Sequence, residues 1–487
     1  MQAYDLIVIG SGPAGRRAAV QAAKLKKSVL VVEKGRRVGG VCVHTGTIPS
    51  KTLRETVLNL SGWRERGFYG RAHRAKHDIT ANDLRQRLSI TLDHEVEVLE
   101  HQFARNNVAW VTGTARFVDA HTIEVANDSG MQYFSAEKII LAVGTAPYRP
   151  PHIPFDGEIV LDADEILDLK RLPRSLAVIG GSVIGIEYAT IFSALDVKVT
   201  VIDPAERVLP FIDKELVDEF VHDMRDRGMT LRFESKLKAV KKMGQDACLI
   251  ELEDGRQIWS EMILFAAGRK GAIDGLSLEA CGLAGDERGR IDVNRETYQT
   301  KVPHIYAVGD IIGFPSLAST SMEQGRIAAC WAFGANAHAP QEFFPYGIYS
   351  VPELSTIGMT EEQVRAKKIP YECGIARFRE TSRGHIMGLH SGFMKMIFSL
   401  ETRRLLGVHI VGEGATELIH IGQAVLNLGG TLDYFVENTF NYPTLAEAYK
   451  IAALDAWNRM PRQQPSASAF EEATAALARF ATAARAV

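Results

Sequence analysis

The sequence predicts an α/β protein in which one strand–helix–strand unit occurs twice and a smaller α+β domain follows. Short apolar runs bounded by glycine alternate with helical patterns, which is typical of parallel sheets flanked by helices. The two units also match in spacing, because Gly10 to Glu33 and Gly180 to Asp203 each span 23 residues. From about Phe344 onward, strands are followed by two further helical patterns. We therefore expect two similar parallel sheets and a third, different domain.

The first unit and the segment after it contain five expected elements. They are a buried strand YDLIVIG (4–10), a helix PAGRRAAVQAAKLKK (13–27), a strand SVLVVEK (28–34), a long helix (81–106) and short strands ending in KIILAVGTAPYRP (138–150). Within the stretch CVHTGTIPSK (42–51), Cys42 and His44 are expected to lie in one loop. A proline cluster at Pro147, Pro150, Pro151 and Pro154 predicts a linker.

The second unit repeats the order of the first. Its expected elements are SLAVIG (175–180), the helix VIGIEYATIFSAL (183–195) and DVKVTVID (196–203), followed by strands and a turn that end in EMILFAAGRKGA (261–272). The chain continues with a buried strand HIYAVGD (304–310) and the helices SMEQGRIAACWAFG (321–334), ATELIHIGQAVLNLG (415–429) and PTLAEAYKIAALDAWN (443–458). The last residues are expected to form a flexible linker (461–469) and an alanine-rich helix (470–487).

Composition and charge narrow the class of protein. The chain has 487 residues, of which 46% are hydrophobic, and its formal net charge is -3, which argues against a nucleic-acid or membrane partner. Its five cysteines are scattered and odd in number, unlike a secreted disulfide framework or a metal site. No apolar run approaches the roughly 20 residues of a membrane span, and the first strand begins too early for a signal peptide. A soluble cytoplasmic protein is expected.

The stretch GSGPAG places three glycines between the first strand and helix. Gly10 allows the tight turn, Gly12 lets a pyrophosphate approach the backbone, and Gly15 lets the helix pack on the strand. The helix N-terminus then offers free N–H groups to the phosphates. Glu33 ends the next strand, where its carboxylate can accept from ribose hydroxyls. A Rossmann-like dinucleotide-binding unit is predicted.

The second copy, GGSVIG, has Ser182 in place of the middle glycine. Either the pyrophosphate shifts slightly or the serine hydroxyl binds it, and a unit that has lost its ligand is the alternative. Asp203 at the strand end favours a free ribose 2′-hydroxyl and repels a 2′-phosphate. This feature favours NAD over NADP.

Many ordered motifs between about Tyr4 and Asn458 resemble the flavoprotein disulfide reductases, which include glutathione reductase and dihydrolipoamide dehydrogenase. The motifs are GSGPAG, GGVCVHTGTIPSK, AVGTAP, GGSVIGIEYA, AAGRKG, HIYAVGD, SMEQGRIAA, VPELSTIGMTEEQ, LLGVHIVG and NYPTLAEAY. The resemblance implies an FAD-binding domain (1–150 and 275–345), an NAD(P)-binding domain (151–274), a C-terminal dimerisation domain (346–460) and a tail (461–487). It also implies a homodimer or a higher homo-oligomer.

The resemblance gives roles to single residues. Asp310 matches the acid that contacts the ribityl and pyrophosphate region of FAD, and Lys51 and Glu187 match a catalytic pair beside flavin N5 at the nicotinamide face. Together with the phosphate loops, the expected cofactor-binding residues are Gly10, Ser11, Gly12, Pro13, Ala14, Gly15, Glu33, Lys34, Gly40, Cys42, Thr47, Lys51, Gly144, Gly180, Ser182, Val183, Ile184, Gly185, Glu187, Asp203, Gly268, Arg269, Gly309, Asp310 and Ala318.

Two departures from the family pattern affect the expected function. A disulfide reductase needs two thiols and a base, but Cys42 is followed five residues later by Thr47, and YPTLAE places Tyr442 where the family has a histidine, although Glu447 remains. A tyrosine, with a pKa near 10, is a poor proton shuttle at neutral pH. The family's thiol chemistry therefore lacks two of its three groups.

The remaining set is similar to the soluble (Si-specific) pyridine nucleotide transhydrogenases of bacteria, which share the single cysteine, a threonine before IPSK, and FNYPT. This resemblance implies that NADPH gives a hydride to flavin N5, that NADP leaves, and that NAD then takes the hydride, without a general base and without a metal.

Two other functions stay open. One is an NADH-dependent flavin reductase or oxidase for quinones, dyes or oxygen, and the other is a nucleotide-sensing or scaffold flavoprotein whose tail (463–487) engages a partner. Some residues also have a structural interpretation: His44 as a holder of loop geometry, His420 as a core or interface histidine, Cys42 as a packing remnant and Arg269 as a strand cap.

Overall fold

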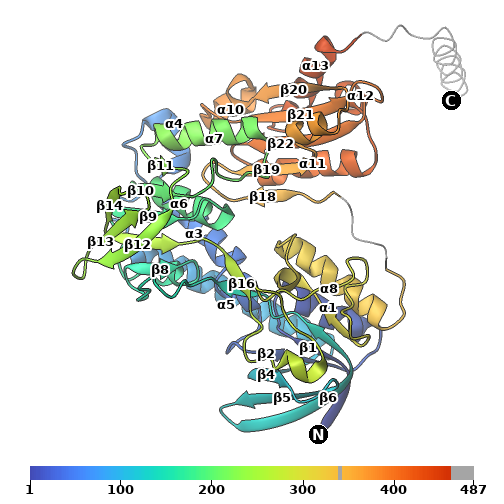
Figure 1. The fold of residues 1–487 in the computed structure, drawn as a ribbon. Coiled ribbons are helices and arrows are strands. Elements are labelled where there is room, and N and C mark those ends of the chain that lie inside the picture. The colour runs from blue at the N-terminus through green and yellow to red at the C-terminus, as the bar shows by residue number, and fades with distance from the viewer. Residues whose placement is uncertain (338–342, 462–487) are drawn as a thin grey trace, which may run out of the picture.

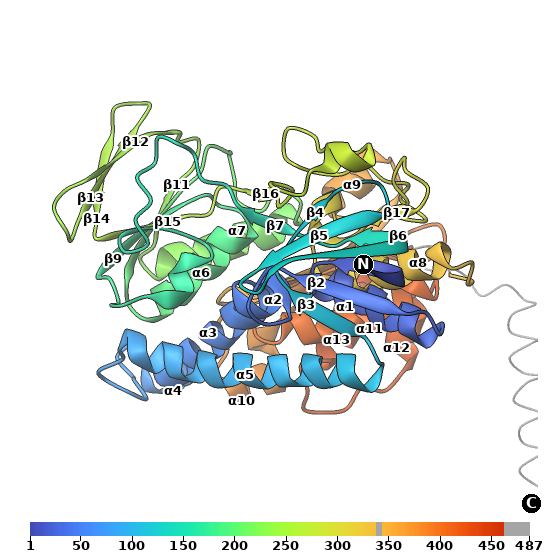
Figure 2. The same ribbon diagram turned by 90° about the horizontal axis from the view of Figure 1, so that it is seen from below.

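The computed structural model describes residues 1–337 and 343–461, and it confirms the predicted α/β class. Figure 1 shows three groups of elements, each built around its own sheet. Figure 2 shows the long helix α5 (Ala81–Arg105) extended along one edge of the molecule. Among the described helices, none is both long and apolar enough to cross a bilayer. The alanine-rich helix predicted for the tail lies outside the described residues.

The first sheet has seven strands in the order β3-β2-β1-β6-β5-β4, and β17 pairs with β6. Its strands are β1 (Gln2–Ile9), β2 (Val29–Glu33), β3 (Ala109–Thr112), β4 (Thr114–Phe117), β5 (Thr122–Asn127), β6 (Gly130–Leu141) and β17 (Ile305–Ala307). The strands β1, β2, β6 and β17 run parallel, so their carboxyl ends meet at one edge. The helices α1 (Pro13–Lys24) and α8 (Ala318–Ala332) pack together beside this sheet (Figure 1).

The second sheet is parallel and has the strand order β11-β10-β9-β15-β8. Its strands are β8 (Val160–Asp162), β9 (Ser175–Ile179), β10 (Lys198–Ile202), β11 (Thr230–Arg232) and β15 (Met262–Phe265), and a small antiparallel sheet holds β12 (Leu237–Lys242), β13 (Cys248–Leu252) and β14 (Gln257–Ser260). The helix α6 (Val183–Ala194) follows β9, as predicted.

The expectation that only strands and a turn follow the second unit is wrong. An amphipathic helix, α7 (Lys214–Asp226), begins after β10, and the Asp213 side chain caps it by accepting from the Glu215 N–H. Its buried residues recur at helical spacing (Leu216, Val217, Phe220, Val221 and Met224). That spacing is a helix signal that the sequence does contain.

Two short strands join the halves of the molecule. β7 (Thr145–Pro147), just before the second unit, pairs antiparallel with β16 (Arg269–Gly271), just after it. Arg269 strengthens this junction, because it donates to the Thr145 hydroxyl (2.9 Å) and carbonyl (2.8 Å) and to Asp164 (3.1 Å).

The third sheet has the order β18-β19-β22-β21-β20, and every pairing in it is antiparallel. Its strands are β18 (Tyr346–Ile348), β19 (Leu354–Gly358), β20 (Tyr371–Arg377), β21 (Phe393–Ser399) and β22 (Leu405–Val411), and its helices are α9 (Glu361–Ala366), α10 (Ser382–Met387), α11 (Ala415–Asn427), α12 (Leu432–Glu437) and α13 (Glu447–Arg459). Helix α13 begins four residues later than predicted.

The loop expected at Cys42 and His44 is wrong, because most of the stretch from Cys42 to Lys51 is helical. These residues belong to two helices, α2 (Gly40–His44) and α3 (Thr47–Leu60). Pro49 lies in the first turn of α3, where a proline removes no hydrogen bond that the helix needs. The remaining short helices are α4 (Arg66–Tyr69), η1 (Trp63–Glu65), η2 (Glu165–Asp168), η3 (Leu278–Cys281), η4 (Gly309–Ile312) and η5 (Phe378–Glu380).

A buried ionic cluster fastens the second unit to the third sheet. Lys395 on β21 is 1% exposed, and its ammonium lies 3.1 Å from Asp213, 2.5 Å from Glu361 and 3.0 Å from Glu215. Asp213 also accepts from the Glu361 N–H (3.0 Å). Burial by itself raises the pKa of Asp213, but His409, the Glu361 N–H and Lys395 outweigh it, so this pKa lies below its ordinary value. Burial is likewise outweighed at Glu361, whose pKa is lowered chiefly by Lys395.

Replacing Lys395 by methionine should lower the free energy of unfolding by about 3–5 kcal/mol, because it leaves buried carboxylates without their cation. Both carboxylates have depressed pKa values, so their contribution is complete above the ordinary values of 3.8 and 4.5 and is lost as the pH falls through the folded values. The difference between wild type and variant, measured by urea unfolding, should therefore shrink in acid.

Lys214→Met is the matched control, because Lys214 pairs with Asp218 on the exposed face of α7. Its loss should stay below about 0.5 kcal/mol. Equal losses for the two variants would contradict a stabilising role for the buried cluster.

Candidate functional site

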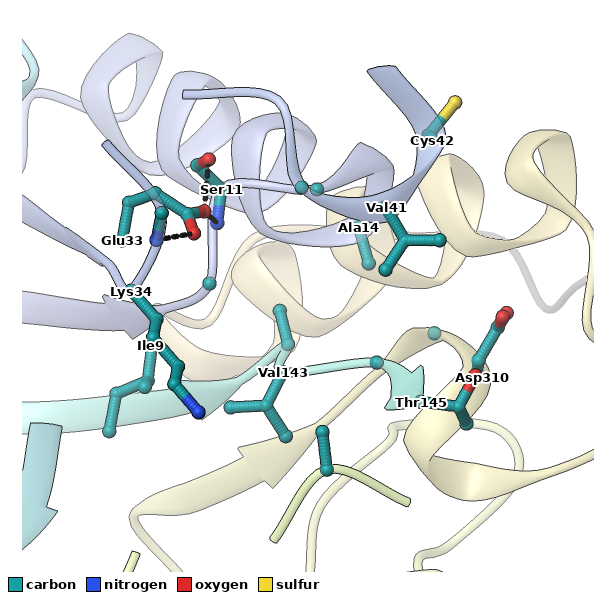
Figure 3. Close-up of a pocket in the computed structure, with 18 of the residues that line it drawn as sticks. Ile9, Ser11, Ala14, Glu33, Lys34, Val41, Cys42, Val143, Thr145 and Asp310 are labelled. Carbon is teal, nitrogen blue, oxygen red and sulfur yellow. Dashed lines mark hydrogen bonds between the residues drawn. The ribbon is translucent and has the colours of Figure 1, made fainter. Parts of the chain in front are cut away.

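A cavity of about 760 Å³ opens where the carboxyl ends of β1, β2, β6 and β17 meet. Figure 3 shows Glu33 and Ser11 at one end of it and Cys42 and Asp310 at the other. The structure brings fourteen of the predicted cofactor-binding residues to its lining. These are Gly10, Ser11, Gly12, Pro13, Ala14, Glu33, Lys34, Gly40, Cys42, Thr47, Gly144, Gly309, Asp310 and Ala318.

The three glycines of the first phosphate loop serve different purposes. Gly10 has φ +103°, and a Cβ there would lie 2.4 Å from the Ala142 carbonyl oxygen. Gly15 is needed for packing, since its Cβ would lie 1.9 Å from the Gly10 carbonyl oxygen. A Cβ at Gly12 would meet no atom within 4 Å. The protein itself therefore requires Gly10 and Gly15, whereas the space beside Gly12 is free for a ligand.

Glu33 holds the phosphate loop from the end of β2. One carboxylate oxygen accepts from the Ser11 N–H (3.0 Å) and hydroxyl (2.5 Å), and the other accepts from the Gly35 N–H (2.7 Å). A carboxylate has about four acceptor positions, so three of them are already used. One position remains for the ribose contact that the sequence predicts.

The second phosphate loop has the geometry of the first with one change. Gly180 has φ +112°, and a Cβ at Gly185 would lie 1.9 Å from the Gly180 carbonyl oxygen. Ser182 has φ −76° and ψ 178°, close to the −61° and −176° of Gly12, so its backbone is unstrained. The Ser182 hydroxyl donates to the Ala266 carbonyl (3.2 Å) at the end of β15.

Asp203 occupies the position of Glu33 in the second unit. Its carboxylate accepts from the Gly181 N–H (2.5 Å) and the Ala205 N–H (2.7 Å). Val183 and Ile184 form the first turn of α6 and are partly buried against the core of the second sheet. None of these residues lines the cavity of the first unit, so the predicted nucleotide residues form two separate groups.

An ion pair joins the two groups. The Lys51 ammonium, on α3, lies 2.8 and 2.7 Å from the two carboxylate oxygens of Glu187, on α6. Glu187 is 4% exposed and also accepts from the Tyr349 N–H (2.9 Å). The ammonium lies 4.9 Å from the centre of the Tyr349 ring, a cation–π distance. Sequence analysis missed Tyr349, because no residue pattern distinguishes it.

Cys42 and Thr47 lie close together across the turn between α2 and α3. Burial raises the pKa of the Cys42 thiol, and the hydrogen bond with Thr47 and the charge of Arg16 only partly oppose this. The thiol is therefore protonated at neutral pH, and in this state it is a weak nucleophile.

The acidic end of the cavity contains Asp310 and Asp164. Burial raises the pKa of both carboxyl groups, and the charge of Arg269 opposes the shift in each case. Arg269 does not line the cavity, and its hydrogen bonds to Thr145 and Asp164 support the structural interpretation of this residue. Asp164 was not predicted, since it lies outside the motifs.

The remaining candidates occupy less central positions. The His44 ring pairs with the Val38 carbonyl (3.0 Å), which agrees with a role in local geometry. His420 is exposed on α11 beside Gln423, so its interpretation as a core histidine is wrong, and the interface interpretation stays a prediction. Tyr442 is 66% exposed, and its hydroxyl pairs with that of Ser382. Gly268 has φ +119° and open space beside it.

Comparisons with known proteins agree with this geometry. Residues 4–325 match the family model described as pyridine nucleotide-disulphide oxidoreductase, and residues 344–453 match the dimerisation domain of the same family. Proteins named soluble pyridine nucleotide transhydrogenase are similar over 94% of this chain and 98% of their own: one from Mycobacterium tuberculosis (strain ATCC 25177 / H37Ra) is 50% identical, and one from Colwellia psychrerythraea is 42% identical.

Two solved structures are similar to this chain in fold. The Cu(II) complex of the HOCl-induced flavoprotein disulfide reductase RclA from Escherichia coli has a TM-score of 0.84 at 26% identity, over 93% of this chain and 99% of that one. LpdA from Mycobacterium tuberculosis has a TM-score of 0.85 at 25% identity, with the same coverage. With both phosphate loops and the Lys51–Glu187 pair in place, the chain belongs to the pyridine nucleotide-disulphide oxidoreductase family.

Proposed function

We propose that this protein is an FAD-dependent, Si-specific transhydrogenase that transfers a hydride from NADPH to NAD⁺ by a ping-pong mechanism at one nicotinamide site. The main support is the Lys51–Glu187 ion pair, which joins α3, whose first residue Thr47 lines the cavity of the first unit, to α6 of the second unit. The relatives named soluble pyridine nucleotide transhydrogenase support the same reaction.

The first unit fits FAD on three observations. The cavity of about 760 Å³ lies within the usual range for ligand sites of about 300–1,000 Å³. The space beside Gly12 is open at the N-terminus of α1, where unpaired N–H groups favour a pyrophosphate. Glu33 retains one acceptor position for a ribose hydroxyl. When bound, FAD supplies a ring that can accept and return a hydride.

The residues of the chain then position the nucleotide and fix the charge at the junction of the two units. Glu187 holds the Lys51 ammonium by two hydrogen bonds, so one cation stays between the first cavity and α6. The Tyr349 N–H restrains Glu187 in turn. Hydride exchange needs no general base, and we assign none. The second unit has to bind NADPH, release NADP⁺ and bind NAD⁺ at the same place.

The same residues are unsuited to disulfide reduction. Cys42 has a threonine as its neighbour, and burial keeps its thiol protonated. Tyr442 replaces the base, and its hydroxyl is paired with Ser382. A homodimer built through the dimerisation domain is part of this proposal, as the matched model suggests.

A flavin reductase or oxidase that uses NADH is the second candidate function. Asp203 supports it, because a carboxylate at this strand end favours a free 2′-hydroxyl and disfavours the 2′-phosphate of NADPH. Its two hydrogen bonds to backbone N–H groups are compatible with either nucleotide.

The two candidates differ in one assay. Purified protein with NADPH and thio-NAD⁺, and no other acceptor, should produce thio-NADH, and double-reciprocal plots should give parallel lines because both nucleotides use one site in turn. Lys51→Met should slow the reaction by about 10- to 100-fold, the effect of losing a charged hydrogen bond. Lys214→Met, on the exposed face of α7, should not change it. Intersecting lines would contradict a single site.

Reductive titration tests the missing dithiol. Without oxygen, the bound flavin should be fully bleached by about one two-electron equivalent, since Cys42 has no thiol partner. Thr47→Cys should form a disulfide with Cys42 and take up a second equivalent, because Thr47 lies close enough to Cys42 to lower the pKa of its thiol. Turnover with glutathione or lipoamide disulfide should remain negligible, as acid–base help worth about 10²–10⁴-fold is missing at Tyr442.

Cys42→Ser/Thr47→Cys is the control and should return to one equivalent. Rapid disulfide reduction by Thr47→Cys alone would show that the missing base does not limit the reaction.

The glycine geometry predicts opposite behaviour for two neighbouring variants. Gly12→Ala should fold with unchanged stability but bind FAD at least about tenfold more weakly, because its methyl group occupies only the space meant for the ligand. Gly15→Ala should instead destabilise the protein itself, since its Cβ would overlap the Gly10 carbonyl. Thermal unfolding of the flavin-free protein and titration with FAD measure the two effects. Unchanged FAD affinity in Gly12→Ala would place the pyrophosphate elsewhere.

A further inference from the structure

Tyr346 begins β18 at the junction between the third sheet and the second unit. Strand alternation places Tyr346 and Ile348 on the same face, and Ile348 is fully buried in an apolar cluster that includes residues of α3 and α6. Tyr346 is partly buried against the same cluster. Its ring meets that of Phe211, from the loop between β10 and α7, with centroids 4.9 Å apart and the planes at 62°.

Tyr346 packs against the same apolar cluster as Val183 and Ile184, which form the first turn of α6 and belong to the second group of site residues. Burial, together with the charges of Glu187 and Asp310, raises the pKa of Tyr346 to about 12. Glu187 belongs to the ion pair with Lys51, and Asp310 lines the cavity of the first unit.

The hydroxyl of Tyr346 is a free donor. It is protonated at neutral pH, and no described residue accepts a hydrogen bond from it; the Tyr346 main chain is paired separately, through the Ser355 hydroxyl and β19. Half-buried tyrosines usually find a partner for the phenol. The Tyr349 N–H, three residues further on, is held by Glu187, so this end of β18 is fixed beside the junction.

From this placement we propose that Tyr346 is a further binding residue for the nucleotide substrates, whose hydroxyl donates a hydrogen bond to the carboxamide oxygen of the nicotinamide. This inference rests on the proposed function, because that function requires a nicotinamide to reach the junction between Glu187 and Asp310. The carboxamide is neutral and offers an acceptor at the rim of the reacting ring. Phe211 orients the phenol by ring contact and makes no hydrogen bond in this role.

Tyr346→Phe removes the hydroxyl and keeps the ring on Phe211, so it should fold as the wild type does. In the FAD-loaded protein, we expect the dissociation constants of NAD⁺ and NADP⁺ to rise about three- to tenfold, the usual effect of losing one neutral hydrogen bond. The affinity for ADP-ribose, which lacks the nicotinamide, should not change. Calorimetric titration of the oxidised protein measures all three without turnover.

Tyr133→Phe is the matched control, because it removes a phenol that donates to Glu124 in the β4–β6 part of the first sheet. It should leave all three affinities unchanged. Unchanged NAD⁺ binding in Tyr346→Phe would overturn the proposal, and so would an equal loss for ADP-ribose. If the wild-type protein binds both nucleotides but forms no thio-NADH, the proposed transhydrogenase function is wrong. The binding measurements on Tyr346→Phe would still test the role of Tyr346.

Discussion

The ion pair between Lys51 and Glu187 is the contact that joins the two strand–helix–strand units of the proposed site. Each unit can form its own phosphate loop, because the glycine positions need only the local strand and helix. The pair instead joins helices from different units, α3 and α6. The Tyr349 N–H, just after β18 of the third sheet, also donates to Glu187, so the third domain contacts the pair as well. Its geometry therefore depends on how all three sheets are packed. The buried Lys395 cluster also fixes the second unit to the third sheet, and this packing holds α6 and Tyr349 in the positions that the ion pair needs.

The two units differ in one residue that matches their proposed tasks. Gly12 leaves the pyrophosphate position open, as suits a cofactor that stays bound. Ser182 has nearly the same backbone angles, but its hydroxyl has a protein partner in the Ala266 carbonyl. A nucleotide that binds there has to compete with or bypass this hydrogen bond. Under the proposed function, we expect this competition to weaken nucleotide binding slightly, which suits a site that one nucleotide must leave before the next enters.

Local features could be predicted from the sequence, and contacts between distant segments could not. Both phosphate loops followed from glycine spacing, because the requirement is imposed by backbone geometry within a few residues. The Lys51–Glu187 pair, 136 residues apart in sequence, came only from family resemblance. Tyr346 and Tyr349 carried no signal, since their roles arise where β18 meets the other two domains. Lys395 stood within an apolar strand, and its partners lie on α7 and α9.

The β7–β16 ribbon has a consequence for how this protein could have been assembled. Directly paired residues of antiparallel strands lie roughly 5 Å apart, and Pro147 is paired with Arg269. The chain thus leaves the first domain and returns to it at nearly the same point. A segment with adjoining ends can be inserted into a host fold, or exchanged for another, without separating the strands around it. Under the proposed function, the second unit could therefore be replaced as a whole, which would change the nucleotide preference and leave the cavity of the first unit intact.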